Sequence, residues 1–325
     1  MRDWREKMKI SVIGCGRWGS FISWYLDRRG HQVTLYGRKS SKNMMSFLDT
    51  RTNGLLELPE TIKLETDIEE AIRSEVIIIS VNSQGLRTLM EEMKQYELKN
   101  RIFVLCMKGM EVSTGKRLTE VMEEYMHASS KVAVWLGPGH VQEFYKGVPN
   151  CMVIDSKDEQ VKEVLIDSFS SDLIRFYYGN DLIGNEIGGA TKNIIGIAAG
   201  MLDGLSLSSL KGALMSRGTR EISRLIEALG GNVHSAYGLC HLGDYEATVF
   251  SAHSHNRMFG ERFVKGGGFE ALAEGFHTTE AIMKISEEAG VDLPICSAVY
   301  DVLFLNKDPK ESLERLFVRS LKEEF

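Results

Sequence analysis

One lysine of this chain lies where a charge is costly. Residues 181–204 read as a single long helix that is apolar almost all round, and Lys192 is the one cation in it. No acid stands three, four or seven positions away, whereas Gly188, Gly189 and Gly196 suggest that another segment approaches closely. An ammonium in such a place must lose its charge, find a distant carboxylate or face a ligand. We predict a functional role for Lys192; the ordinary alternative is a side chain that extends to solvent.

Asp244 is the carboxylate best suited to pair with Lys192. It follows Gly243 in a polar segment, 239–248, where it could also be only a turn residue or a helix cap. Asn256 and Arg257 place an amide beside a guanidinium, which suits a phosphate or carboxylate. A surface arginine in a polar loop is an equally good interpretation of that pair.

Histidines cluster in the same half of the chain. Five of the eight lie between His234 and His277, so a metal site must be considered. His253 and His255 could share one face of a strand, but no third and fourth ligand follow at a compact spacing. We therefore predict that the chain binds no metal.

A glycine-rich loop follows the first β-type run, 9–13, and precedes a helical pattern. It reads Gly14-Cys15-Gly16-Arg17-Trp18-Gly19, and strand, GxGxxG and helix together are the context of a dinucleotide-binding site. Gly14 permits the tight turn, Gly16 lets backbone N–H groups approach the pyrophosphate, and Gly19 lets the helix pack on the strand. We predict a dinucleotide cofactor here, with Arg17 and Trp18 beside it; a glycine turn without a ligand is the alternative.

The second strand, 32–36, ends in Gly37-Arg38-Lys39-Ser40-Ser41. An NAD site usually places an Asp or Glu near this point to hold the ribose 2′-OH, and none is present. Arg38 and Lys39 instead favour a 2′-phosphate, hence NADP over NAD, unless Arg38 only stacks on the adenine.

Strand and helix patterns alternate along the first half of the chain. We expect further strands at 61–64, 76–81, 102–106, 132–136, 151–154 and 174–176, and a helix at 67–72. Ligands of open α/β sheets bind at the carboxyl ends of the strands, which is where Asn82, Lys108 and the 137–141 turn fall.

From residue 181 onward the strand signals stop and helical periodicity takes over. We expect helices at 181–204, 210–229 and 278–289, one starting at Pro294, and one at 311–321. The prediction is an α/β protein with two domains. Residues 1–180 form a Rossmann-type, doubly wound, mostly parallel sheet that binds the dinucleotide, and residues 181–325 form an all-α substrate and catalytic domain.

Composition excludes several classes of protein. A chain of 325 residues can bury two cores, and a net charge of −6 argues against nucleic-acid binding. No apolar run approaches the ~20 residues of a membrane span, and the charged start of the chain is unlike a signal peptide. Five scattered cysteines without a CxxC fit reduced thiols. We expect a cytoplasmic protein with a small phosphorylated substrate and no nucleic-acid or membrane partner, forming a homodimer.

With these residues in view, the chain resembles the bacterial-type NAD(P)-dependent glycerol-3-phosphate dehydrogenases nearly end to end. The most specific stretch is the lysine-bearing helix, NEIGGATKNIIGIAAGMLDGL. The other stretches that carry the resemblance are VIGCGRWGS, CMKGME, GPGHVQEF, RGTREISRL, GLCHLGDYEAT, SHNRMFGERF, AEGFHTT and PICSAVYDVL.

The resemblance implies an oxidoreductase that interconverts dihydroxyacetone phosphate and sn-glycerol 3-phosphate with NADP or NAD, supplying the glycerophospholipid backbone. It implies that Lys192 is catalytic, with Lys108 and Asp244 close to the reacting carbon. The substrate and phosphate pocket is then lined by Asn193, Thr248, His255, Asn256 and Arg257. The implied cofactor contacts, beyond the glycine loop, Arg38 and Lys39, are Asn82, Lys108, Val141, Arg257 and Glu274.

Two motifs depart from the family pattern. A turn of the GPSFA type reads Gly137-Pro138-Gly139-His140-Val141, and the phosphate-binding RNR reads His255-Asn256-Arg257. A histidine binds phosphate when protonated, and more weakly near pH 7 because its ordinary pKa is ~6.5. Two alternatives follow: a related dehydrogenase acting on a different phosphorylated or acidic hydroxy compound, and a nucleotide-sensing or scaffold protein without turnover.

Overall fold

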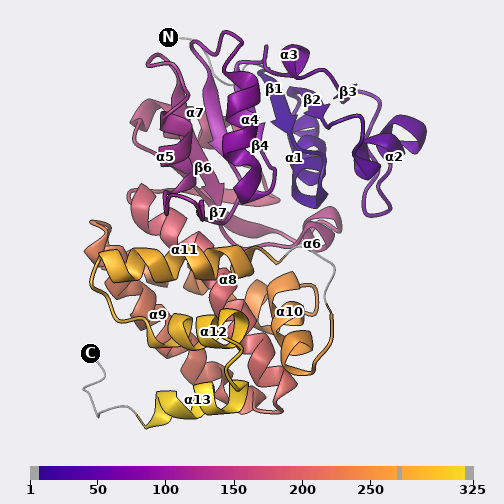
Figure 1. Cartoon of the computed structure of the whole chain (residues 1–325). Helices are drawn as coiled ribbons and strands as arrows, with labels where there is room; N and C mark the ends of the chain where they lie inside the picture. The colour runs from indigo at the N-terminus through magenta and orange to yellow at the C-terminus, as the bar shows by residue number, and fades with distance from the viewer. Residues whose placement is uncertain (1–6, 269–272, 319–325) are drawn as a thin grey trace. The chain divides into compact units, whose positions relative to one another are not determined.

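The computed structural model describes residues 7–268 and 273–318, which form two compact units, each with its own hydrophobic core (Figure 1). The first unit comprises the chain up to Lys108 together with Lys116–Leu182. The second comprises Gly109–Gly115 and the chain from Ile183 onward. The short segment Gly109–Gly115 thus belongs to the helical unit although it lies in the first half of the sequence, which periodicity did not indicate.

A single sheet organises the first unit. Within the described residues it has eight strands in the order β3-β2-β1-β4-β5-β6-β7-β8, with all neighbours parallel except β6 and β7. The strands are β1 Lys9–Ile13, β2 Gln32–Tyr36, β3 Lys63–Glu65, β4 Val76–Ile79, β5 Ile102–Leu105, β6 Lys131–Leu136, β7 Asn150–Ser156 and β8 Ile174–Tyr178. The predicted doubly wound, mostly parallel sheet is confirmed. The third strand begins later than expected because Ile62 closes a hydrogen-bonded turn on Pro59.

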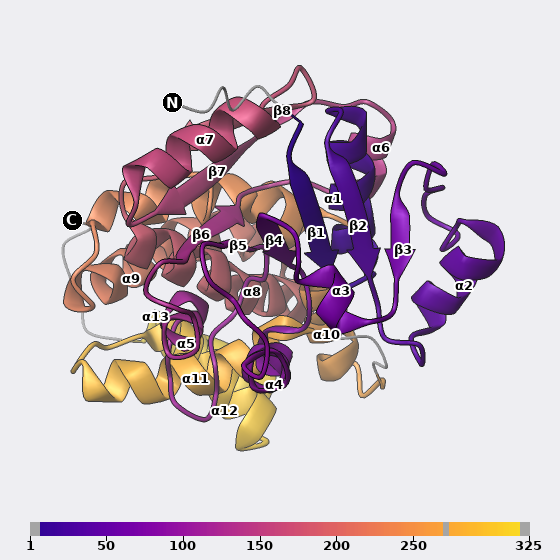
Figure 2. The same cartoon turned by 90° about the horizontal axis from the view of Figure 1, so that it is seen from above.

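Helices cover both faces of this sheet, as the view from above shows (Figure 2). One face carries α1, α6 and α7, and the other carries α3, α4 and α5. The helices of the unit are α1 Arg17–Arg28, α2 Lys42–Thr50, α3 Ile68–Ala71, α4 Leu86–Met93, α5 Leu118–Glu123, α6 Val141–Tyr145 and α7 Glu159–Phe169, with a 3₁₀ turn η1 at Ser83–Gly85. Strands with helices on both faces of the sheet are apolar along their length because both faces are buried. All four residues of β4 are buried in this way.

The second unit is helical. Its α-helices are α8 Leu182–Gly204, α9 Lys211–Ala228, α10 His255–Val264, α11 Glu274–Glu288, α12 Pro294–Phe304 and α13 Pro309–Phe317. Shorter 3₁₀ helices lie at η2 Ser208–Leu210, η3 Val233–Tyr237 and η4 Leu242–Asp244, and a π-helix lies at η5 Glu246–Phe250. The polar segment 239–248 therefore consists largely of short helices. His253 and His255 do not share a strand, because His255 opens α10. The end of the predicted tail helix, 319–321, lies outside the described residues.

Helix α8 is buried along nearly its whole length, and its glycines explain how other segments come so close to it. A Cβ built on Gly200 would lie 1.9 Å from the carbonyl oxygen of Arg257, and one on Gly196 would lie 2.6 Å from Cγ2 of Thr248. Side chains at these positions would push α10 and η5 away from α8. The close approach that the glycines around Lys192 suggested is thus confirmed.

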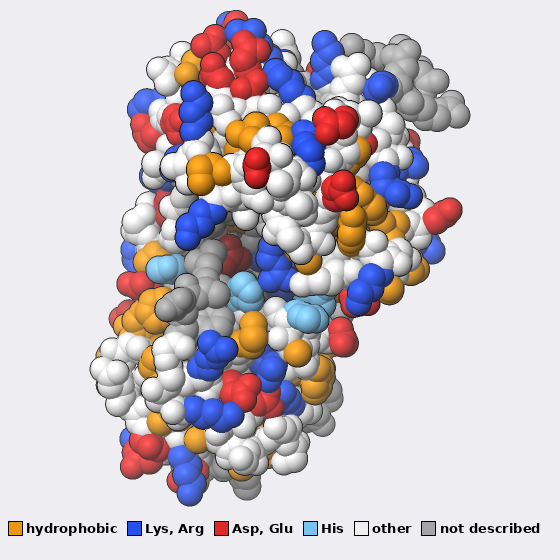
Figure 3. Space-filling view, turned by 90° about the vertical axis from the view of Figure 1, so that its right-hand side faces the viewer, with side chains coloured by type: hydrophobic (Ala, Val, Ile, Leu, Met, Phe, Trp, Pro, Cys, Tyr) orange, Lys and Arg blue, Asp and Glu red, His pale blue; other side chains and the backbone are white. Residues whose placement is uncertain are grey.

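The hydropathy of the helices and the distribution of charge characterise the described surface. No helix in the described part of the chain is long and apolar enough to cross a bilayer. On the face shown in Figure 3, acidic and basic side chains intermingle. Mixed charge of this kind is typical of an ordinary solvated surface.

Candidate active site

Lys192 pairs with the carboxylate expected for it. Its Nζ lies 2.8 Å from Oδ2 of Asp244 and donates a hydrogen bond of 2.8 Å to Oγ1 of Thr248. Only 7% of Lys192 and 1% of Asp244 are exposed, so the lysine does not reach solvent. The predicted Lys192–Asp244 pair is confirmed, and it is a buried ion pair with a hydroxyl beside it.

The partners of Lys192 come from two consecutive short helices. Asp244 is the last residue of η4, and Thr248 lies in the π-helix η5. The Thr248 hydroxyl donates to the backbone carbonyl of Asp244 at 2.7 Å, which directs its lone pairs toward the ammonium. π-helical turns are rare and occur frequently at functional sites. Here the π-helix aims Thr248 at Lys192.

Two asparagines link three helices of the second unit. Asn256 of α10 donates from Nδ2 to Oδ1 of Asn193, the residue after Lys192, at 3.0 Å. Its own Oδ1 accepts the backbone N–H of Gly275 in the first turn of α11 at 2.9 Å. Asn193 and Asn256 are therefore held beside the lysine position by contacts with α8, α10 and α11.

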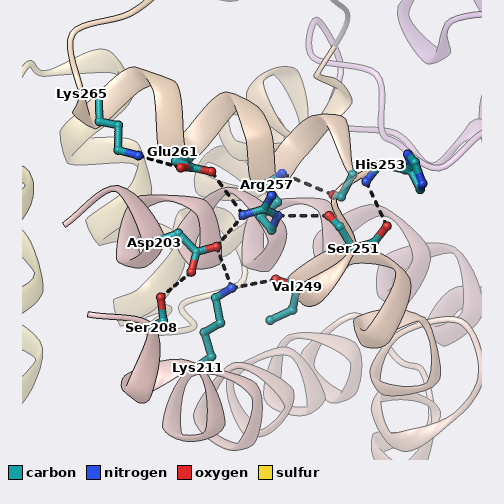
Figure 4. A network of polar contacts seen from close by, with 10 residues as sticks. Asp203, Ser208, Lys211, Val249, Ser251, His253, Arg257, Glu261 and Lys265 are labelled. Atoms are coloured by element: carbon teal, nitrogen blue, oxygen red, sulfur yellow. Dashed lines mark hydrogen bonds and ion pairs between the residues drawn. The ribbon is translucent and has the colours of Figure 1, made fainter. Parts of the chain in front are cut away.

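Arg257 is engaged with other protein groups (Figure 4). Its Nη1 lies 2.6 Å from Oδ2 of Asp203 and 3.2 Å from Glu261, and its Nε donates to the carbonyl of Ser251 at 3.0 Å. Nζ of Lys211 lies 2.6 Å from the same Asp203 oxygen. Although burial opposes it, these hydrogen bonds hold the pKa of Asp203 below its ordinary value. Asp203 thus bridges two cations.

Both cations of this network also hold the end of η5. Lys211 donates to the carbonyl of Val249 at 3.1 Å, and Arg257 binds that of Ser251. Unpaired carbonyls at the end of a helix attract cations. The network therefore anchors the segment that carries Thr248.

His255 and Glu274 occupy the first positions of α10 and α11. Both side chains are half-buried. Ser254 caps α10 by accepting the N–H of Arg257 at 3.3 Å. Positions at a helix N-terminus suit an anion because the backbone N–H groups point outward.

The glycine loop of the first unit has the geometry of a dinucleotide site. Gly14 has φ +115°, and a Cβ there would lie 2.3 Å from the carbonyl oxygen of Ser80. A Cβ on Gly19 would lie 1.9 Å from the carbonyl of Gly14, so helix and strand meet there without room for a side chain. Nothing lies within 4 Å of a Cβ on Gly16, and α1 begins at the next residue without a side-chain cap. A pyrophosphate fits at that open helix start.

Aromatic rings fix the neighbourhood of the loop. Trp18 packs against Phe21 at 5.3 Å between ring centroids and against Phe144 of α6 at 6.2 Å. Arg17 is exposed, and Val141 is buried in the core of the unit. A contact of Val141 with the cofactor would therefore have to come from its backbone.

The remaining predicted cofactor residues lie at strand ends of the first unit. Arg38 is exposed and lies 3.4 Å from Glu92, and Lys39 is exposed beside it. Asn82 caps η1 by accepting the N–H of Gln84 at 2.9 Å, and Lys108 donates to the carbonyl of Gly137 at 2.6 Å. These positions stay predictions for cofactor contact.

Sequence reasoning missed four residues of this unit: His241 and Tyr245 near the Lys192–Asp244 pair, and Asp203 and Lys211 in the network that holds the end of η5. His241 and Tyr245 stand four positions apart, a spacing that could have drawn attention to them. Asp203 and Lys211 gave no such signal, because the turn between α8 and α9 brings them together. Among residues 7–268 and 273–318, no three His, Cys, Asp or Glu side chains are placed to hold a metal ion.

Comparison with known proteins decides the family. Residues 9–162 match the N-terminal model, and residues 181–314 the C-terminal model, of NAD-dependent glycerol-3-phosphate dehydrogenase. The chain belongs to this dehydrogenase family. It is 37% identical over 329 residues to glycerol-3-phosphate dehydrogenase [NAD(P)+] of Thermoanaerobacter sp. (strain X514), covering 98% of this chain and 99% of that protein. It is 37% identical over 331 residues to the protein of the same name from Chlorobium phaeobacteroides (strain BS1), covering 98% and 99%.

A crystal structure in the glycerol-3-phosphate dehydrogenase family has the same fold. The enzyme from Coxiella burnetii superposes with a TM-score of 0.89 at 27% identity, covering 96% of this chain and 99% of that one. The resemblance inferred from the motifs is therefore confirmed over nearly the whole chain.

Proposed function

We propose that this chain is an NAD(P)-dependent oxidoreductase that interconverts dihydroxyacetone phosphate and sn-glycerol 3-phosphate. The observation that carries the proposal is the buried Lys192, the one cation of the mostly apolar helix α8, which is bound to Asp244 of η4 and Thr248 of η5. A charge with no structural need for that place is expected to meet a substrate. Membership of the family supplies the substrate class.

Bound NAD(P)H would supply the hydride, and the chain's own residues would bind, orient and protonate the substrate. The Lys192 ammonium would polarise the C2 carbonyl and donate a proton to the forming alkoxide oxygen. Asp244 would keep the ammonium charged and oriented, and Thr248 would fix its direction. In the reverse reaction the same lysine would accept the hydroxyl proton.

We assign the substrate phosphate to the first turn of α10 and the amides beside it. His255, Asn256 and Asn193 would contact the substrate. Arg257 we assign a supporting role, because Asp203, Glu261 and the Ser251 carbonyl occupy its guanidinium. Lys108 would add positive charge close to the reacting carbon, and Glu274 would contact the cofactor.

We propose that the glycine loop, Arg17, Trp18, Arg38, Lys39, Asn82 and Val141 hold the cofactor. The cations Arg38 and Lys39 favour NADP, and the ratio of kcat/KM for NADPH and NADH tests this preference. We further propose that the protein forms a homodimer in the cytoplasm and supplies the glycerophospholipid backbone. Sedimentation of the purified protein checks the dimer.

The first test is the initial rate of NADPH and NADH oxidation with dihydroxyacetone phosphate at about pH 7. We expect kcat within the usual enzyme range of roughly 1–10³ s⁻¹. Lys192→Ala should lower kcat roughly 10²–10⁴-fold because a general acid is lost, with unchanged affinity for NADPH. Lys265→Ala, an exposed lysine of α10's end paired with Glu261, is the matched control. A Lys192→Ala protein with wild-type turnover would refute the assignment.

One observation favours a second candidate. Because His255 stands where the family pattern has an arginine, the substrate could be another phosphorylated or acidic hydroxy compound. A panel of such compounds assayed by NADPH absorbance separates the two candidates. Tight cofactor binding with no oxidation by any substrate would instead revive the nucleotide-sensing alternative.

A further inference from the structure

A second buried group lies against the turn of α8 that precedes Lys192. His241 is 0% exposed and stands three positions before Asp244. Its Nδ1 lies 2.9 Å from the carbonyl oxygen of Gly188, and its Nε2 lies 2.7 Å from the hydroxyl of Tyr245, which is also 0% exposed. The reaction as described above does not use this pair.

The partners of His241 fix its tautomer. A backbone carbonyl can only accept, so Nδ1 carries the proton toward Gly188, and Nε2 accepts from the Tyr245 hydroxyl. Burial, with a smaller contribution from the charge of Lys192, lowers the pKa of His241 from 6.5 to about 4, while the bond to Gly188 and the charge of Asp244 oppose this. Burial also raises the pKa of Tyr245, which keeps the phenol protonated. The ring is therefore neutral at physiological pH.

Two contacts connect the η4 turn to α8: His241 with Gly188, and Asp244 with Lys192. Gly188 and Lys192 are one helical turn apart on α8, and His241 and Asp244 lie at the two ends of the η4 turn. A Cβ on Gly188 would lie 3.0 Å from Cβ of His241, so the turn packs directly on the helix. The His241–Gly188 bond thus sets the register in which Asp244 meets Lys192.

We propose that His241, held by Tyr245, is a positioning residue that aligns the Asp244 carboxylate with the Lys192 ammonium. The proposal rests on the function proposed above. The charged and titratable groups that bear on the ring are Lys192, Asp244 and Tyr245, with Glu221 and Cys296 beyond the phenol. A neutral ring also avoids placing a second cation beside Lys192.

A pair of substitutions separates positioning from packing. His241→Asn keeps an amide N–H where Nδ1 lies and can still donate to Gly188, whereas His241→Leu fills similar space without a donor. We expect His241→Leu to lower kcat roughly 10–100-fold with little change in KM or NADPH affinity, since misplacement of about 1 Å costs this much. His241→Asn should recover most of the loss. The exposed His253→Leu is the control.

Either of two kinetic results would overturn the proposal. One is a kcat of His241→Leu within about two-fold of wild type. The other is equal loss of kcat in both variants together with equal thermal destabilisation, which would show a packing role alone.

A spectroscopic test of the proposal does not depend on enzyme turnover. In ¹⁵N-labelled protein, His241 should show the neutral, Nδ1-protonated tautomer from about pH 5.5 to 8. A His241 that titrates in this range, or carries its proton on Nε2, overturns the inference. Absence of turnover in the wild type with dihydroxyacetone phosphate would defeat the proposed function, and the tautomer would still be measurable.

Discussion

A charged side chain on an apolar helix can be recognised from the sequence, and Lys192 is identified as a functional candidate in this way. Asp244 could also be named as the carboxylate best suited to pair with it, because it follows Gly243 in a polar segment. The hydroxyl of Thr248 could not be placed in this way. It depends on a π-helix, and π-helical turns leave no periodicity that distinguishes them from ordinary helix. Residue types and spacing therefore yield the ion pair, whereas Thr248 was named only through the family resemblance.

Glu221 of α9 lies in a position that makes stability depend on pH. Its buried carboxylate accepts the N–H groups of Ile295 at 2.8 Å and Cys296 at 2.9 Å, in the first turn of α12. Burial raises its pKa from 4.5 to about 7, although these two hydrogen bonds oppose the rise. Between these two pH values the folded protein holds a proton that the unfolded chain has lost. Stability from this group is therefore full below the lower value and falls as the pH rises through the higher one.

The difference in unfolding free energy between wild type and Glu221→Gln isolates this effect. We expect it to fall by roughly 2–3 kcal/mol from about pH 5 to pH 8, measured by urea unfolding. The comparison is needed because His241, with its lowered pKa, contributes the opposite slope below its ordinary pKa: its stabilisation is lost as the pH falls from 6.5 toward 4. A difference that stays constant with pH would show that Glu221 is ionised throughout.

His255 offers a test of the phosphate site. His255→Arg would place a permanent charge in the first turn of α10, and a charge-assisted hydrogen bond stabilises binding by about 1.5–3 kcal/mol. We expect KM for dihydroxyacetone phosphate to fall roughly ten-fold or more, with kcat little changed, because such binding is equal in ground and transition states. His253→Arg, two residues earlier and exposed, is the matched control. An unchanged KM would mean that the phosphate lies elsewhere.

At the scale of elements, the eight described strands of the first unit were all expected from sequence, each within two residues of its observed ends. Strands β1 and β2 have the expected bounds, since apolar runs that end in glycine leave little choice. The antiparallel pairing of β7 with β6 was not predicted, because a buried strand reads the same in either direction. In the second unit α8, α9, α11, α12 and α13 were predicted, but α10 and the short helices η2 to η5 were not. The glycines of α8 indicated a close approach but not that α10 and η5 make it.

The network around Asp203 is the support for η5 and α10, and Arg257→Ala tests it. The substitution removes one of two cations from a mostly buried carboxylate and one of the two donors to the Ser251 carbonyl, which keeps the N–H of Ser254. We expect the unfolding free energy to fall by about 2–4 kcal/mol and kcat to fall together with a rise in KM. Arg224→Ala, which loses an exposed bond to the Asp292 carbonyl, should cost about 0.5 kcal/mol or less. If Arg257 binds the substrate phosphate instead, KM would rise while stability stayed unchanged.

At the scale of the whole molecule, the chain has two cores, one under the sheet and one around α8. We propose that the cofactor binds to the first unit. NADPH should therefore raise the stability of that unit, by about 2.7 kcal/mol at a hundred times its dissociation constant. Differential scanning calorimetry should show one transition moving upward on addition of NADPH and a second one moving much less. A single transition that shifts as a whole would show that the two cores unfold cooperatively.

The position of the segment Gly109–Gly115 in the sequence limits how the helical unit can be exchanged by recombination. Met110 is part of the core around α8, and a Cβ on Gly115 would touch Ile285 of α11 at 3.2 Å, so this piece of the helical unit is encoded between β5 and α5. A gene recombined at a single point near codon 182 would deliver a helical unit that lacks it. An exchange of the helical unit would therefore have to carry both the segment Gly109–Gly115 and the chain from Ile183 onward.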